Sequence, residues 1–150
     1  MAKPTLDTRF RKIDVDAYNE DVYREEEETD TPGLGPDESE VMGHLRSGRN
    51  MDALLAGLKN PPVKSRNQTQ KDKASQLLLK VLTSFKSSEV EAAVQKLSQE
   101  QLEALMKYVY KGFEFPQEGS SAALLNWHDQ VFKVGGLGCI VRTFTDKKRL

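Results

Sequence analysis

The sequence has a single cysteine, Cys139, among its 150 residues. One cysteine cannot form an internal disulfide, which suits a reducing compartment such as the cytosol. The chain also lacks any apolar run approaching the ~20 residues that a membrane-spanning helix needs. No apolar run follows the positive charges of the first residues, so we expect no secretory signal. A net charge of −1 provides no general attraction to nucleic acid or to membranes.

Metal-ligating side chains of the Cys and His kind are scarce. A structural zinc site needs four such ligands at suitable spacing, whereas this chain offers Cys139 and two distant histidines, His44 and His128. We therefore expect no metal and no cofactor. Acidic side chains are plentiful, but they lie in a run of four glutamates or at predicted helix starts, where the helix dipole favours them without a catalytic role.

Three glycines and the cysteine cluster in VGGLGCIVR, residues 134–142. The string lacks the Gly-Lys-Ser/Thr ending of a P-loop, and no predicted strand precedes it, which disfavours nucleotide binding. Gly135 or Gly136 is interpreted as the left-handed residue that ends a helix, and Gly138 as a position that lets a neighbouring backbone approach. Cys139 lies in an apolar helical context, where a free cysteine acts as a small buried hydrophobe.

Charge is segregated along the first 36 residues. Residues 13–30 hold nine acidic side chains and one arginine, a net charge of −8, directly after the basic stretch Arg9-Phe10-Arg11-Lys12. Apolar or aromatic side chains recur there at intervals of one to four residues: Phe10, Ile13, Val15, Tyr18, Val22 and Tyr23. TPGLGP, residues 31–36, has the composition of a linker. We predict that residues 1–36 form an extended arm and linker that dock along a partner, with a plain acidic solubility tail as the alternative.

From residue 37 onward the pattern is helical. Apolar residues recur at the i, i+3, i+4, i+7 spacing of helices, and no sustained alternation typical of strands appears. Helices this short must stack on their neighbours to bury a face. The sequence therefore predicts an all-α body, residues 37–150, with about seven short helices in an α-α superhelix or an irregular bundle.

Capping residues predict several helix boundaries. Predicted starts are Asp37 and two pairs that resemble capping boxes, Ser88 with Glu91 and Ser98 with Gln101. Predicted ends are Gly48, Asn60-Pro61-Pro62 and Gly112. The last helix is predicted to run from Leu137 to about Asp146.

Aromatic side chains gather in KYVYKGFEFP, residues 107–116, and Trp127 follows soon after. Some of them must belong to the core. Tyrosine and tryptophan also serve as anchors in protein interfaces, so we predict partner contacts at Tyr108, Tyr110, Phe113 and Trp127. The nearby pair Lys107 and Lys111 lies close to a predicted helix C-terminus, where cations are favoured, and does not by itself indicate nucleic-acid binding.

Several strings together resemble one known family, subunit 5 of the actin-related protein 2/3 complex, which nucleates branched actin filaments. They are RFRKIDVDAYNEDVY, LLLKVLTSFKSSEVEAAVQKL, LMKYVYKGFE, LLNWHDQ and VGGLGCIVRTFT, in order over nearly the whole chain. GPDESEV, at the start of the first predicted helix, and the turn KNPPV also resemble the family. Cys139 stands where the family usually has serine, which argues against a catalytic thiol.

The resemblance implies a structural subunit without enzymatic activity, in the cytoplasm with the cytoskeleton. Its helical body would pack against the β-propeller subunit and subunit 4, and its arm would tether an actin-related subunit. Carried over by position, the implied arm contacts are Arg9, Phe10, Arg11, Val15, Asp16 and Tyr18. Two alternatives stay open: a stand-alone armadillo-like adaptor that binds a peptide in a groove, and a small enzyme that uses Cys139.

Overall fold

Short helices follow one another along residues 35–147 and 149–150, the part of the chain that the computed structural model describes. They are α1 (Glu38–Arg46), α2 (Asn50–Leu58), α3 (Gln68–Ser84), α4 (Ser87–Gln95), α5 (Gln99–Glu114) and α6 (Ser120–Thr145). These residues include no strand. The predicted all-α class is confirmed, while the predicted arm lies almost wholly outside the described residues.

Helix α6 is bent at Gly136, which has φ 68° and ψ −176°. A side chain strongly disfavours this backbone conformation, so a glycine is needed there. The bend divides α6 into two helical segments. Counted this way the described chain has seven helical segments, in agreement with the prediction, and Gly136 is the left-handed residue that ends the first of the two.

Two of the predicted helix starts are confirmed by their hydrogen bonds. The Asp37 carboxylate accepts from the backbone N–H of Ser39 at 2.8 Å. The Ser98 hydroxyl accepts from the Gln101 N–H, and the Gln101 side chain accepts from the Ser98 N–H at 2.9 Å. These bonds satisfy N–H groups that have no partner within the helix.

The predicted box of Ser88 with Glu91 is wrong, because α4 already begins at Ser87. The carboxylate that reaches back is Glu89, which accepts from the backbone N–H of Lys86 at 3.2 Å. The sequence has two acidic residues two positions apart, Glu89 and Glu91, and either could follow a helix start by three residues. The backbone turn at Lys86 decides between them.

Of the remaining glycine predictions, the one for Gly48 is confirmed and those for Gly112 and Gly138 are wrong. Gly48 follows α1 with φ 69° and ends it as expected. Gly112 does not end α5, which continues to Glu114; it lies against α6, where an added Cβ would come within 2.9 Å of Leu124 Cδ1. At Gly138 an added Cβ would meet the Arg142 side chain at 2.9 Å, so no neighbouring backbone approaches there.

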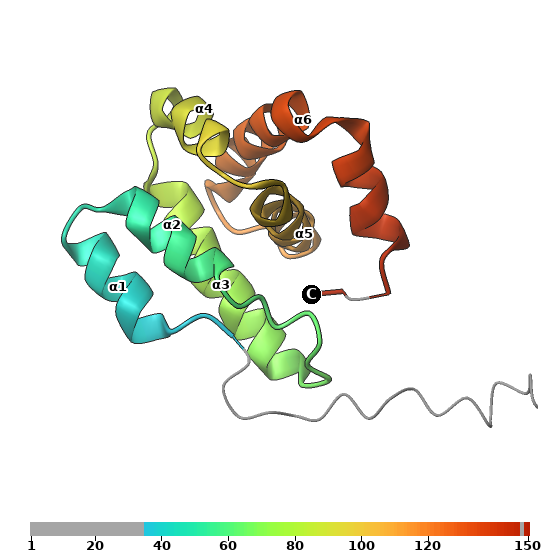
Figure 1. The fold of residues 1–150 in the computed structure, drawn as a ribbon. Helices are drawn as coiled ribbons and strands as arrows, with labels where there is room; N and C mark the ends of the chain where they lie inside the picture. The colour runs from blue at the N-terminus through green and yellow to red at the C-terminus, as the bar shows by residue number, and fades with distance from the viewer. Residues whose placement is uncertain (1–34, 148) are drawn as a thin grey trace, which may run out of the picture.

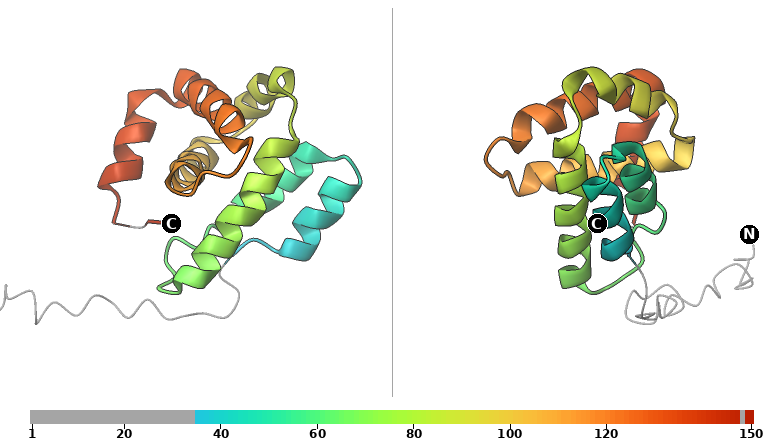
Figure 2. Two further views of the ribbon diagram at one scale, coloured as in Figure 1. Left: turned by 180° about the vertical axis from the view of Figure 1, so that it is seen from behind. Right: turned by 90° about the vertical axis from the view of Figure 1, so that its left-hand side faces the viewer.

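Helix α5 runs through the middle of the described body, with the other helices around it (Figure 1). It packs most extensively against α6, and α3 contacts α1, α2, α5 and α6. The two views in Figure 2 show α1 and α2 beside α3 on one side, with α6 curving around α5 on the other. The arrangement is an irregular bundle in which the bend of α6 lets its last segment return along α5.

Trp127 on α6 is the largest fully buried side chain. Its indole Nε1–H donates to the Leu82 carbonyl at the end of α3 at 3.0 Å, and its ring meets Phe85 edge-on at 5.1 Å. Burial of so large an apolar ring, with its one polar atom satisfied, fixes α6 against α3. Among the described helices, none combines the length and the apolar character of a membrane span.

Candidate functional site

Cys139 lies in the core, with no exposed surface. Its Sγ is 3.6 Å from the Leu102 carbonyl of α5. Burial raises the pKa of this thiol, with a smaller contribution from the Glu103 carboxylate. A neutral thiol is a poor nucleophile, so the surroundings agree with the interpretation of Cys139 as a packing residue.

The two histidines have partners of their own. His128 Nε2 lies 2.9 Å from the hydroxyl of Tyr110, and His44 Nε2 lies 4.0 Å from Glu40. Within residues 35–147 and 149–150, no group of three or more His, Cys, Asp and Glu side chains is placed to hold a metal ion.

The four aromatic residues predicted to contact partners occupy different environments. Trp127 is 0% exposed and Tyr108 is 3% exposed, so both are core residues of this chain. Burial raises the pKa of Tyr108, and its hydroxyl has no hydrogen-bond partner in the described part of the chain. Their role as partner anchors stays a prediction, and this burial argues against it.

Tyr110 and Phe113 are partly buried and reach the surface in one aromatic cluster. The Tyr110 ring is 5.8 Å from Phe113, 5.4 Å from His128 and 4.6 Å from Phe144, each in an edge-on arrangement. Burial is also the main cause that raises the pKa of Tyr110. The cluster joins the end of α5 to both segments of α6, so these two residues lie beside an exposed apolar region.

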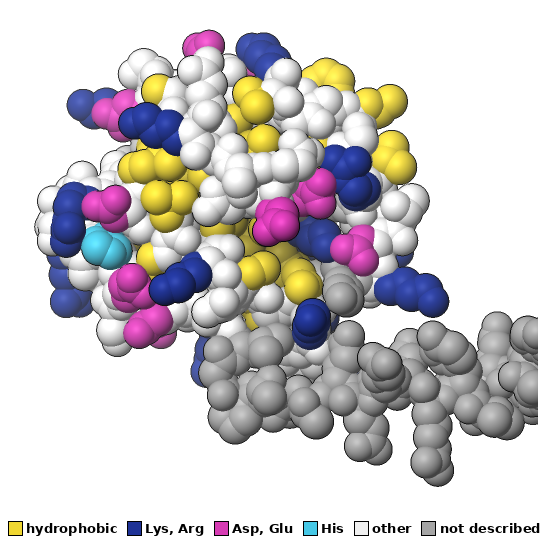
Figure 3. Space-filling model, viewed as in Figure 1, with side chains coloured by type: hydrophobic (Ala, Val, Ile, Leu, Met, Phe, Trp, Pro, Cys, Tyr) yellow, Lys and Arg dark blue, Asp and Glu magenta, His cyan; other side chains and the backbone are white. Residues whose placement is uncertain are grey.

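Most of the exposed large hydrophobic side chains lie on α6. We call these six the α6 apolar surface: Leu125, Phe132, Val134, Leu137, Val141 and Phe144. Figure 3 shows hydrophobic side chains exposed over the bend of α6, at the upper right. Leu137 is 66% exposed and Phe144 is 54% exposed. Exposed apolar side chains gathered on one element mark interaction surfaces more often than scattered ones do.

The second segment of α6 presents three of these residues in a row. Leu137, Val141 and Phe144 are spaced by four and three residues, which places them on one helix face. The spacing was present in the sequence, but it also fits a core-facing stripe. The structure places Cys139 in the core, as the sequence predicted, and so leaves the stripe on the outside.

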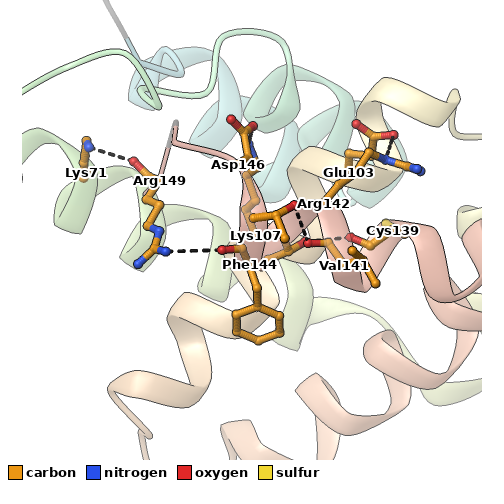
Figure 4. A network of polar contacts seen from close by, with 11 residues as sticks. Lys71, Glu103, Lys107, Cys139, Val141, Arg142, Phe144, Asp146 and Arg149 are labelled. Carbon is orange, nitrogen blue, oxygen red and sulfur yellow. Dashed lines mark hydrogen bonds and ion pairs between the residues drawn. The ribbon is translucent and has the colours of Figure 1, made fainter. Parts of the chain in front are cut away.

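Polar contacts hold this segment and the chain end against α5 and α3. The Arg142 guanidinium is 2.7 Å from the Glu103 carboxylate, and Lys107 Nζ is 2.5 Å from Asp146. Lys71 of α3 donates to the carbonyl of Arg149 at 2.7 Å. Figure 4 shows these residues together, with the chain end beside α3 and Arg142 directed at Glu103. The contacts fix the direction in which the apolar stripe faces.

The residues predicted to contact a partner through the arm lie outside the described residues. They are Arg9, Phe10, Arg11, Val15, Asp16 and Tyr18. Their role stays a prediction.

Comparisons with known proteins agree over almost the entire length. Residues 9–150 match the family model described as ARP2/3 complex 16 kDa subunit (p16-Arc). The chain is 52% identical over 148 residues to actin-related protein 2/3 complex subunit 5-C of Xenopus laevis, covering 99% of each chain. It is 49% identical over 151 residues to the human subunit 5-like protein, again covering 99% of each chain. Against subunit 5 of Dictyostelium discoideum it is 39% identical over 111 residues, 74% of this chain and 79% of that protein.

Proposed function

Because this chain belongs to the ARP2/3 complex 16 kDa subunit (p16-Arc) family, we propose that it is a non-catalytic structural subunit of that complex. In this role it contributes to the nucleation of branched actin filaments in the cytoplasm, with the cytoskeleton. The helical body docks on core subunits, the β-propeller subunit and subunit 4. The N-terminal arm tethers an actin-related subunit.

The α6 apolar surface is the observation that supports docking of the body. Six large hydrophobic side chains of one helix stay exposed outside the described core. Covering them in an assembly would remove apolar area from water, at roughly 25 cal/mol for each Å². Interfaces of permanent complexes have this apolar character. We therefore assign the body-side interface to α6, together with the adjoining Tyr110 and Phe113.

Charge placed on this surface should prevent assembly without unfolding the body. Leu137→Asp with Val141→Asp alters two exposed side chains and leaves Cys139 in place. We expect a tagged double variant to lose co-purification of the other six subunits from cell extract by at least ~10-fold, since a buried unpaired charge costs several kcal/mol. Phe115→Asp is the matched control, an exposed hydrophobic residue outside α6. Equal retention of all subunits by both variants would remove α6 from the interface.

The basic, acidic and regularly spaced apolar side chains of residues 9–18 support the tether. An extended segment needs no pocket, and it raises the effective concentration of what it holds close to the body. Ordering the segment costs conformational entropy. Burial of its apolar side chains and pairing of its charges on docking offset that cost. The implied contacts are Arg9, Phe10, Arg11, Val15, Asp16 and Tyr18.

Deletion of residues 1–36 separates the arm from the body. We expect the shortened chain to keep its helical circular dichroism and its binding to core subunits, while an actin-related subunit is lost on washing. Phe10→Ala with Arg11→Ala should give a weaker form of the same loss. Unfolding of the body on deletion would contradict the tether.

The same purification tests the two alternatives. A monomer that captures only short peptides would support a stand-alone armadillo-like adaptor. An activity that disappears in Cys139→Ser would support an enzyme. Neither alternative accounts for similarity along 99% of the chain to subunit 5 relatives.

A further inference from the structure

A groove opens where the described chain begins, between the residues before α1 and one face of α3. It has a volume of about 370 Å³ and is lined by Gly35, Pro36, Glu38, Gln70, Lys73, Ala74, Gln76, Leu77 and Lys80. Figures 1 and 2 show the start of the described chain beside α3. Whatever precedes Gly35 in the chain therefore leaves the body at this groove.

Two lysines of the groove have exposed side chains that no described group neutralises. The side chains of Lys73 and Lys80 form no hydrogen bond or ion pair with any part of the chain in the described ranges, and Glu38 is the one carboxylate among the lining residues. They are seven residues apart on α3, so they lie on one face about 10 Å apart along the helix axis. Between them, Ala74 and Leu77 form a buried floor.

The preceding segment carries the charge that fits these lysines. Residues 25–30, EEEETD, hold five carboxylates in six positions. In a polyproline II conformation, with three residues per turn, carboxylates three residues apart lie on one face about 9 Å apart, close to the spacing of the two lysines. Asp30 lies five positions before Gly35, so it stays within about 18 Å of the groove, and Glu25, ten positions before Gly35, stays within about 36 Å.

The net charges of the body and of the acidic segment also favour their attraction. Residues 35–150 contain 17 basic and 13 acidic side chains, a net charge of +4, whereas residues 13–30 carry −8. The short connection gives the acidic segment an effective concentration in the millimolar range near the groove. Pairing with lysines would also relieve repulsion among neighbouring carboxylates.

We propose that residues 25–30 dock in the groove formed by α3 and residues 35–38, with their carboxylates paired to Lys73 and Lys80. The docked segment sets the point and the direction from which residues 1–24 leave the body. These contacts lie within one chain and do not depend on whether the arm binds an actin-related subunit.

Nuclear magnetic resonance of the full-length chain at low salt tests this directly. The paired variant Lys73→Gln/Lys80→Gln should shift the backbone amide signals of residues 25–30 and restore fast internal motion there. Raising the salt to 1 M should have the same effect on the unmodified chain, since the Debye length then falls to about 3 Å. The control Lys86→Gln/Lys96→Gln alters two exposed lysines beside α4 and should leave these signals unchanged.

A second variant tests the other side of the contact. Replacing Glu25 to Glu28 by glutamine and Asp30 by asparagine should shift signals of α3 around Lys73 and Lys80 and few elsewhere in the body. The proposal is overturned if the groove and control variants have equal effects, or if the shifts map to another face. It is also overturned if the shifts depend on protein concentration, because the segment would then bind a second copy.

Discussion

The two segments of α6 are continuous in sequence and differ in what holds them. The first, residues 120–135, places Leu124, Trp127 and Val131 in the core with no more than 1% of their surface exposed. In the second, residues 137–145, only Cys139 is fully buried, while Leu137, Val141 and Phe144 are exposed. The second segment is held against α5 largely by the ion pairs Arg142–Glu103 and Lys107–Asp146.

The first segment of α6 thus belongs to the stable framework of the body, and the second segment presents an exposed surface. Apolar burial contributes most of the stability of a folded domain, whereas exposed ion pairs contribute little. The first segment should therefore unfold only with the whole body. The second segment has few buried contacts and should open at a lower free energy. A surface that docks on other subunits can be held in this way because the assembly itself covers it.

The largest expected effect is in the first segment. Trp127→Ala removes a fully buried ring and its hydrogen bond to Leu82, so we expect the free energy of unfolding to fall by about 3–5 kcal/mol. Phe144→Ala, in the second segment, should lower it by about 1 kcal/mol or less. Urea unfolding of the two variants, followed by circular dichroism, measures both values. Equal losses would mean that the two segments do not differ.

The junction comes next. Gly136→Ala forces a side chain into a backbone region that essentially only glycine occupies, which costs about 1–3 kcal/mol. Gly43→Ala is the matched control, because Gly43 lies inside α1 with nothing within 4 Å of an added Cβ. That variant should gain up to about 1 kcal/mol. Thermal unfolding of both variants decides whether the bend at Gly136 is under this constraint.

Local rules in the sequence predicted much of this framework. The Asp37 and Ser98 caps follow from side chains that satisfy the backbone within three residues. The left-handed Gly136 follows from the permissive backbone of glycine. Such features depend on neighbours along the chain, which the sequence shows directly.

Features that depend on packing between distant segments were not predictable in the same way. Gly112 was predicted to end α5 because glycine often ends helices, but α5 continues to Glu114, and Gly112 instead lies against Leu124 of α6. Trp127 and Tyr108 have the character of interface anchors, yet α6 and α5 direct them into the core. The stripe from Leu137 to Phe144 fits either a core or a surface, and the position of Cys139 decides between them.

A smaller effect is expected where the second segment meets α5. Arg142 and Glu103 are 2.7 Å apart, with side chains 48% and 31% exposed. Exposed pairs of this kind contribute about 0–1 kcal/mol. Arg142→Ala should therefore change global stability little, while hydrogen exchange of residues 137–145 becomes faster. A double-mutant cycle with Glu103→Ala isolates the pair, and a coupling energy well above 1 kcal/mol would place the second segment within the framework.

The smallest effect is expected at Cys139, the one fully buried residue of the second segment. Serine at this position can donate a stronger hydrogen bond to the Leu102 carbonyl, now 3.6 Å from Sγ. Against this, a hydroxyl is harder to bury than a thiol. The two contributions oppose each other, so Cys139→Ser should change the free energy of unfolding by less than about 1 kcal/mol near pH 7.

Alkaline pH should separate the two proteins. Burial raises the pKa of the Cys139 thiol above its ordinary 9.0, so the folded state keeps its proton after the unfolded state has lost it. Stability from this group is complete below pH 9 and falls as the pH rises toward the raised pKa. The serine variant lacks this decline, whereas the Tyr108 contribution is common to both. Urea unfolding between pH 7 and pH 10 should show the free energy of unfolding of Cys139→Ser rising relative to that of the natural protein. Parallel pH dependences of the two would mean that Cys139 is already open to solvent.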